Sequence, residues 1–204
     1  MFVNATFLNA FPSFVKMKEY PVTDETQIIQ ACIEGKSWAQ KAIYDRYASA
    51  MMAVCLRYVT DRETARDLLQ DGFVKVFTKI ETFSGTGVFA GWVRRIFVTT
   101  SLEYLRHNDA LKQSSNIDDL EYQFSAPDAT VIDQLSAAEM MECISRLSDG
   151  YRTVFNLYAI EGYSHAEIAE MLGVNEVTSR TQFMRARKIL QKEIELLFKT
   201  EDVR

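Results

Sequence analysis

Residues 161–190, EGYSHAEIAEMLGVNEVTSRTQFMRARKIL, constrain the fold more than any other stretch of this chain. Ser164 is followed three residues later by Glu167, the capping-box pattern that satisfies free backbone amides at a helix start. Apolar residues then recur at helical spacing, at Ile168, Ala169 and Leu172. Gly173 can take the left-handed conformation that ends a helix. The stretch therefore predicts a helix that begins at Ser164 and ends near Gly173.

A second helix follows, with Asn175 in position to cap it. Its small or apolar residues recur at steps of four, three and four, at Ser179, Phe183, Ala186 and Leu190. Its other faces carry Arg180, Thr181, Met184, Arg185, Arg187 and Lys188. Two helices joined by a short glycine turn, with a basic face on the second, are what recognition of the DNA major groove requires. The pattern also fits an ordinary helical hairpin whose basic face is only solvated.

The composition favours a folded, mostly helical chain of one large or two small domains. Of 204 residues, 48% are apolar and 25% are charged, with only three Pro and eight Gly. The net charge of −5 argues against a protein coated in nucleic acid but is compatible with one basic face. Three cysteines, Cys32, Cys55 and Cys143, lack C-x-x-C spacing. We expect reduced core thiols in a cytoplasmic protein, and neither a disulfide nor a metal site.

No apolar run approaches the roughly 18 residues that a membrane span needs. The N-terminus has no basic segment ahead of its apolar residues, which disfavours a signal peptide. We expect residues 1–22 to be a disordered tail or an extension preceding the true start, for which Met17 is a candidate. The pair Gly85-x-Gly87 lacks the companion residues of a nucleotide loop, so a nucleotide site is not expected there. No cofactor and no small-molecule substrate are predicted for this chain.

Helical periodicity begins at Asp24. A first apolar stripe ends at Gly35. A second helix follows, with Trp38, Ala42, Ile43 and Tyr47 on one face. The helical pattern then runs on to Tyr58, either in the same helix or in a third one. Asp61 offers a cap for a long amphipathic helix over residues 63–80, whose outer face carries Asp67, Gln70, Asp71 and Lys75. A short loop with two glycines then precedes a further helix, with Arg94, Arg95 and Arg106 facing outward.

The periodicity stops after His107 and resumes near Val131. The prediction is an all-α protein with two small helical domains, residues 23–107 and 131–204, and a helix-turn-helix in the second. A flexible acidic linker, residues 108–130, joins them.

Taken together, the motifs resemble one family, the extracytoplasmic-function (ECF) sigma factors of bacterial RNA polymerase. The resemblance spans residues 26–190 and is carried by ARDLLQDGFVKVF (65–77), FSG (83–85), GWVRRI (91–96), LSDGYRTVF (147–155) and EGYSHAEIA (161–169). It implies a promoter-recognising subunit without catalytic activity. Implied partners are core RNA polymerase, promoter DNA and an anti-sigma factor.

The resemblance also implies roles for individual residues. Residues matching the family's polymerase-docking helix are Asp67, Leu69, Gln70, Asp71 and Phe73. Residues matching the part that opens and holds the minus-ten element are Thr86, Phe89, Trp92, Arg94, Arg95 and Thr99; for Trp92, a place in the core is an equal alternative. Residues matching the helix that recognises the minus-thirty-five element are Arg180, Thr181, Met184 and Arg185, with Arg187 and Lys188 on phosphates.

Two positions depart from the family's pattern. Thr99 and Glu103 stand where the family usually has Asn and Asp, which leaves the minus-ten specificity open. Two other classes of protein fit the sequence less well. A stand-alone repressor or activator would use the helix-turn-helix but gives no purpose to the surface over residues 67–77. An enzyme is disfavoured because the sequence offers no catalytic set and no metal-ligand spacing.

Overall fold

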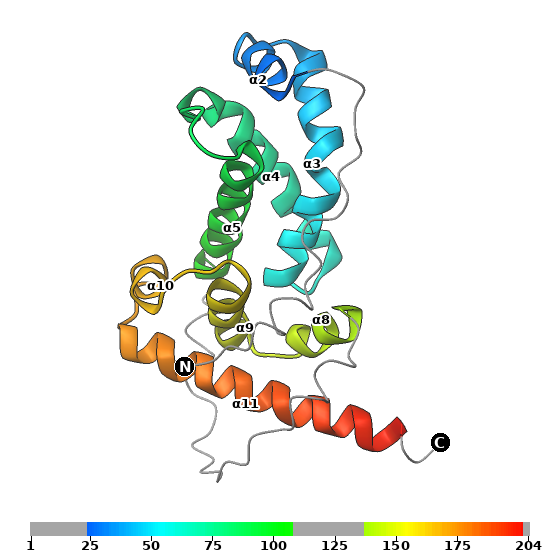
Figure 1. Cartoon of the computed structure of the whole chain (residues 1–204), viewed down its shortest axis with the longest axis vertical. Helices are drawn as coiled ribbons and strands as arrows, with labels where there is room; N and C mark the ends of the chain where they lie inside the picture. The colour runs from blue at the N-terminus through cyan, green and yellow to red at the C-terminus, as the bar shows by residue number, and fades with distance from the viewer. Residues whose placement is uncertain (1–23, 108–136, 202–204) are drawn as a thin grey trace. The chain divides into compact units, whose positions relative to one another are not determined.

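The structure, a computed structural model, describes residues 24–107 and 137–201, and every element in these residues is helical (Figure 1). The all-α class is confirmed. The chain divides into two compact units, with the division between Tyr104 and Leu105. The predicted extension at residues 1–22 and the predicted linker at 108–130 lie outside the described residues.

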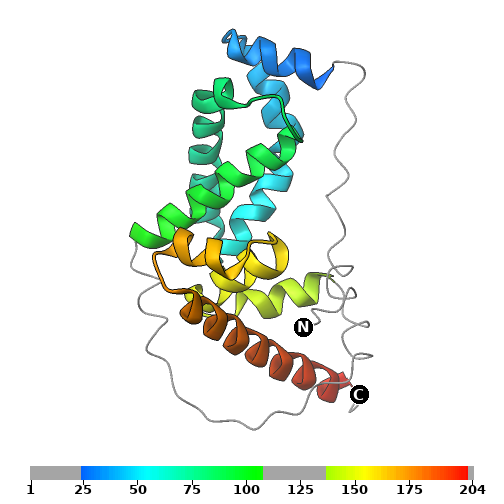
Figure 2. The ribbon, with the colours of Figure 1, turned by 60° about the vertical axis from the view of Figure 1, so that its left-hand side comes forward.

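The first unit is built from α2 (Glu25–Ile33), α3 (Ser37–Tyr58), α4 (Arg62–Lys79), a short 3-10 turn, η1 (Ile80–Thr82), and α5 (Phe89–His107). In both views α3 and α4 lie side by side (Figures 1 and 2), and Figure 2 shows α5 running obliquely across them. The segment after Tyr47 is an extension of the second predicted helix, because residues 48–50 are Ala, Ser and Ala and contain no helix breaker.

Trp38 does not belong to the buried face of α3, contrary to the prediction. The buried positions of this helix are Ala39, Ile43, Tyr47, Met51, Val54, Cys55 and Tyr58. Trp38 precedes this series by one residue, which turns its side chain away from the core and leaves it 54% exposed. The sequence pattern had placed it one position out of register.

The crossing of α4 and α5 depends on a glycine. A Cβ atom at Gly72 would lie 2.3 Å from Cε1 of Phe97, so the ring occupies the space that any other residue would need. Phe97 also packs edge-on against Phe73 with ring centroids 5.2 Å apart. The close approach lets aromatic side chains fill the centre of this unit.

The second unit comprises α8 (Ala137–Ser145), α9 (Asp149–Phe155), a π-helical turn, η3 (Asn156–Ile160), α10 (His165–Leu172) and α11 (Glu176–Glu201). The five residues after α9 thus form a π turn instead of continuing the α-helix. Arg152 is buried and donates to the backbone oxygens of Ser145, at 3.2 Å, and Leu147, at 2.7 Å. It thus satisfies carbonyl groups at the end of α8.

All three cysteines are buried and free of disulfides. Burial raises the pKa of the Cys55 thiol to about 12, and it also raises the pKa values of Cys32 and Cys143. These thiols stay protonated and pack as small apolar groups. Among residues 24–107 and 137–201, no helix is long and apolar enough to cross a membrane, and no cluster of His, Cys, Asp and Glu could hold a metal ion.

Candidate nucleic-acid interface

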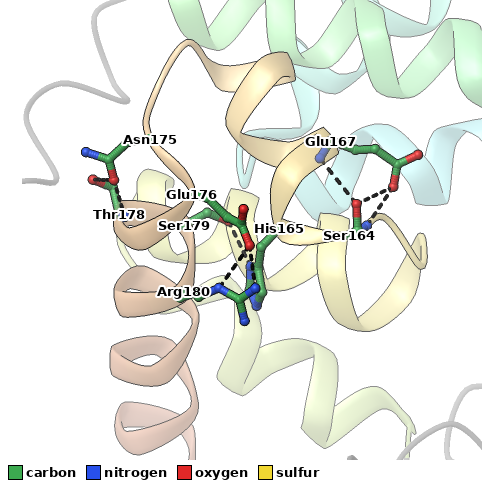
Figure 3. A network of polar contacts seen from close by, with 8 residues as sticks. All are labelled: Ser164, His165, Glu167, Asn175, Glu176, Thr178, Ser179 and Arg180. Atoms are coloured by element: carbon green, nitrogen blue, oxygen red, sulfur yellow. Dashed lines mark hydrogen bonds and ion pairs between the residues drawn. The ribbon is translucent and has the colours of Figure 1, made fainter.

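The two ends of α10 are fixed by its own sequence. Ser164 Oγ accepts a hydrogen bond from the Glu167 amide at 3.3 Å, and the Glu167 carboxylate accepts one from the Ser164 amide at 2.8 Å (Figure 3). Gly173 ends the helix with a φ of 67°. Asn175 Oδ1 accepts from the Thr178 amide at 2.6 Å and caps α11. The helix-turn-helix and all three of its predicted end signals are confirmed.

The inner face of α11 is also the predicted one, because Ser179, Phe183, Ala186 and Leu190 are all buried. The hydroxyl of Ser179 meets His165 there, with Nδ1 of His165 2.9 Å from Ser179 Oγ (Figure 3). The imidazole stacks on Tyr158 at a centroid distance of 4.2 Å. The sequence predicts Ser179 on the inner face of α11 but does not single out His165 as its partner. A serine at a core position was the signal for a buried polar partner.

The environment of His165 keeps its imidazole neutral. Burial lowers its pKa below the ordinary value of 6.5, and the neighbouring Arg180 guanidinium lowers it further, while Glu176 acts in the opposite direction. A neutral ring can share a hydrogen bond with Ser179 without burying a charge. The pair therefore joins the first turn of α10 to the first turn of α11.

Four of the six predicted minus-thirty-five residues, Arg180, Thr181, Met184 and Arg187, are exposed on α11. Arg180 donates from Nε to Glu176 at 3.1 Å and makes a second contact with the same carboxylate oxygen (Figure 3). Arg185 and Lys188 are half-buried. The Arg185 guanidinium lies 3.5 Å from the hydroxyl of Tyr151, so it points toward α9.

The outer face of α4 carries Asp67, Gln70 and Asp71, all exposed, with Leu69 half-buried beside them. Phe73 lies elsewhere. It is 3% exposed and its ring packs against Tyr44, with centroids 4.7 Å apart. Phe73 therefore packs inside the unit and is not part of the exposed face of α4.

The loop before α5 is closed by aromatic packing. Phe89 is buried, with its ring 5.1 Å from Phe83 and stacked at 5.5 Å on Trp92. Trp92 is half-buried and forms the outer layer of this cluster. Thr86 is exposed between Gly85 and Gly87, whose φ values of 73° and 85° require glycine. Of the predicted loop residues, Thr86 is accessible and Phe89 is not.

A pocket of about 180 Å³ lies between α4 and α5. Its lining includes three of the predicted minus-ten residues, and the full set is Lys75, Lys79, Trp92, Arg95, Ile96, Thr99, Thr100 and Glu103. Phe89 and Arg94 are not part of it; Arg94 is half-buried. The pocket thus combines an aromatic wall with cationic groups, as a site for a base on a phosphate backbone requires.

The polar side chains of this pocket differ in whether they have a hydrogen-bond or ion-pair partner. Lys75 Nζ lies 2.5 Å from a carboxylate oxygen of Glu103, which bridges α4 and α5. The Thr99 hydroxyl donates to the backbone oxygen of Arg95 at 2.9 Å. The Thr100 hydroxyl is buried and has no hydrogen-bond partner within the described part of the chain. Sequence reasoning missed Lys79, Thr100 and the ion pair, because each depends on how α4 meets α5.

Comparison with known proteins agrees with both units. Residues 43–110 match the family described as Sigma-70 region 2, and residues 137–190 match Sigma-70, region 4. The ECF RNA polymerase sigma-E factor of Haemophilus influenzae is 26% identical over 186 residues, covering 86% of this chain and 97% of that protein. The RNA polymerase sigma-H factor of Pseudomonas aeruginosa is 23% identical over 185 residues, covering 86% and 96%.

Among solved structures, the sigma factor RpoE in complex with the anti-sigma factor NepR from Bartonella quintana aligns with a TM-score of 0.48. It is 20% identical, and the alignment covers 76% of this chain and 96% of that one. CnrH in complex with the cytosolic domain of CnrY aligns with a TM-score of 0.47 at 20% identity, covering 84% and 97%.

The chain belongs to the sigma-70 family of RNA polymerase sigma factors and is of the ECF type. It directs promoter recognition for transcription initiation, and it is a DNA-binding initiation subunit rather than an enzyme.

Proposed function

We propose that the two units divide promoter recognition between them. The unit α8–α11 binds the minus-thirty-five element in the duplex, and the unit α2–α5 binds core polymerase and opens the minus-ten element. The observation that carries the proposal is the outer face of α11, where Arg180, Thr181 and Met184 are exposed opposite a buried inner face. The first turns of a recognition helix are the ones that reach base edges in the major groove.

At the minus-thirty-five element, Arg180 is the leading candidate for a base contact. Its guanidinium is already oriented by Glu176, and an arginine that approaches guanine in bidentate fashion contributes about 1–3 kcal/mol of discrimination. Arg187 lies further along the exposed face and contacts phosphate. Lys188 is half-buried and contributes charge in the same way. The half-buried Arg185 contacts Tyr151, so we assign it to positioning as well as to DNA contact.

At the minus-ten element, the pocket between α4 and α5 takes a base that has left the stack. Trp92 supplies an aromatic surface and Arg95 and Lys79 supply charge for the backbone of the single strand. We assign Thr86, on the loop before α5, and the half-buried Arg94 of α5 to contacts with the same strand. Thr99 lines the pocket but has its hydroxyl engaged within the helix, so it offers its methyl group to the base. Phe89 supports Trp92 from below.

On α4, the exposed residues Asp67, Gln70 and Asp71, with Leu69, form the contact to core polymerase. Phe73 acts on this contact through the packing of α4. We also propose that an anti-sigma factor binds the protein in the cytoplasm and covers such surfaces. This last proposal follows from the family, in which partners of that kind are common.

A promoter with a pre-opened minus-ten region tests the division directly. Arg95→Ala and Trp92→Ala holoenzymes should initiate poorly on the duplex promoter and recover in part on the pre-opened one, because strand separation no longer depends on them although their contacts to the single strand are still missing. An Arg180→Ala holoenzyme should be weak on both. If the pre-opened promoter rescues all three variants equally, or none of them, the units do not divide the task in this way.

A further inference from the structure

The outermost face of α11 is apolar where a DNA-contacting helix would be expected to be charged. Val177 is 71% exposed and Met184 is 57% exposed. Thr181 lies between them, and the three residues are separated by steps of four and three, which places them on one face of the helix. This face is opposite the buried one that carries Ser179 and Phe183. We call Val177, Thr181 and Met184 the outer stripe.

The hydroxyl of Thr181 does not contribute polarity to the outer stripe. Its Oγ1 donates a hydrogen bond to the backbone oxygen of Val177 at 2.9 Å. The methyl group is then the part of the Thr181 side chain that remains to contact a partner. The outer stripe thus offers two methyl groups from Val177, one from Thr181 and the thioether end of Met184.

Cationic groups flank the outer stripe. Arg180 lies beside it with its guanidinium held by Glu176. Arg187 is exposed about two turns beyond Arg180 and has no ion-pair partner among residues 24–107 and 137–201. An apolar line beside a free cation complements a DNA groove, in which phosphates flank the bases. The outer stripe is also continuous with the face that the proposed function assigns to the minus-thirty-five element.

The groups exposed in the major groove limit what an apolar side chain can recognise there. Each base pair presents hydrogen-bonding groups there, and the apolar group on offer is the C5-methyl of thymine. Contact with that methyl by alanine, the threonine methyl and phenylalanine is a recognised form of base readout. Residues 177 and 184 are seven positions apart, about 10 Å along the helix. That length corresponds to about three base-pair steps at roughly 3.4 Å each.

We propose that the outer stripe contacts the C5-methyl groups of thymines in the minus-thirty-five element, so that Val177, Thr181 and Met184 determine part of the sequence specificity. The inference rests on the proposed function of α11 and names the groups that it recognises. The element then contains at least two thymines within about three base-pair steps, in the part that faces the start of α11.

Replacement of thymine by deoxyuracil tests the inference, because it removes the methyl group and leaves every hydrogen-bonding group in place. The holoenzyme of full-length protein and core polymerase is bound to a promoter that it transcribes, with each upstream thymine replaced in turn. Binding should weaken about fourfold at each contacted position, as expected for losing the burial of one methyl group. The same experiment also records whether the holoenzyme with the parent protein protects the upstream DNA of the unmodified promoter.

Side-chain variants then assign each methyl group to its partner. In Val177→Ala and Met184→Ala holoenzymes, the uracil effect should disappear at one position each and persist at the other. Ile189→Ala, which truncates an exposed apolar residue of α11 outside the outer stripe, should keep both effects. All three residues are exposed, so these truncations leave the core intact.

Two results would overturn the inference, and they differ in meaning. If the upstream DNA is protected but uracil changes binding at no position, or the change is the same in the parent and in both stripe variants, the methyl groups are not recognised by this stripe. If no upstream DNA is protected at all, the proposed function of α11 fails together with the inference.

Discussion

Nδ1 of His165 lies 2.9 Å from Oγ of Ser179, and this buried hydrogen bond joins the first turns of the two helices of the helix-turn-helix. The residues are 14 positions apart in sequence. Tyr158 stacks on the imidazole and Phe183 meets it edge-on at 5.7 Å. The orientation of α11, and so the placement of Arg180 on it, depends on this contact.

Replacing Ser179 with alanine should therefore destabilise the protein. The change leaves Nδ1 of a buried imidazole without a partner, which costs about 1–3 kcal/mol of unfolding free energy. Urea denaturation of the full chain, followed by the loss of helical signal, measures it. Ser145→Ala is the matched control, since that hydroxyl donates to a backbone oxygen on the exposed side of α8. Equal stability of the two variants would contradict the assigned role.

Stability should also depend on pH through His165. Burial first, and Arg180 second, lower its pKa in the folded protein, with Glu176 opposing them. The unfolded chain therefore takes up the proton more readily than the folded one. The stabilisation is fully present above the unfolded pKa of about 6.5, and it is lost as the pH falls through the lower folded value.

The measurement is the difference in unfolding free energy between the parent and a His165→Gln variant from pH 7.5 to 5. That difference should shrink as the pH falls, because only the parent pays for protonation of the ring. A difference that stays constant across this range would show that the ring titrates alike in both states.

Gly72 and Gly91 offer a matched pair of glycine substitutions in the first unit. Alanine at Gly72 would meet the ring of Phe97 at 2.3 Å, so Gly72→Ala should cost about 1–3 kcal/mol by overpacking. Nothing lies within 4 Å of a Cβ at Gly91, where alanine should be neutral or stabilising by up to about 1 kcal/mol. Thermal unfolding of both variants measures the two changes in stability. If Gly72→Ala is as stable as the parent, α4 and α5 are not packed so closely.

Charge reversal on α4 should weaken binding to core polymerase without unfolding the unit. Asp67→Lys and Asp71→Lys alter exposed side chains of the proposed contact. Competition with the parent protein for core polymerase measures the loss, which we expect to be tenfold or more. Glu34→Lys makes the same charge change at the exposed end of α2 and should compete like the parent. Similar losses for all three would indicate a general charge effect.

Local signals in the sequence predicted local structure well. The capping box at Ser164, the turn at Gly173 and the cap at Asn175 each act within a few residues, so their patterns suffice. Periodicity also identified the inner face of α11. It failed at Trp38, where a shift of one residue decides which side of a helix is buried.

Features that depend on two helices meeting could not be predicted. Phe73 and Phe89 matched motifs whose role in the family is binding, yet both are buried, because the rings of the first unit pack on one another. The bridge from Lys75 to Glu103 joins residues 28 positions apart. The pairing of His165 with Ser179 likewise required the crossing of α10 and α11 to be known.

Run-off transcription with purified core polymerase, on a pool of promoter fragments with and without this protein, tests the central claim most directly. The account predicts new transcripts that require the protein and whose start sites share two spaced upstream motifs. Arg180→Ala should reduce use of the upstream motif specifically. If no transcripts appear while the protein alone binds duplex DNA, it acts as a repressor or activator without polymerase, and the account of the first unit is wrong.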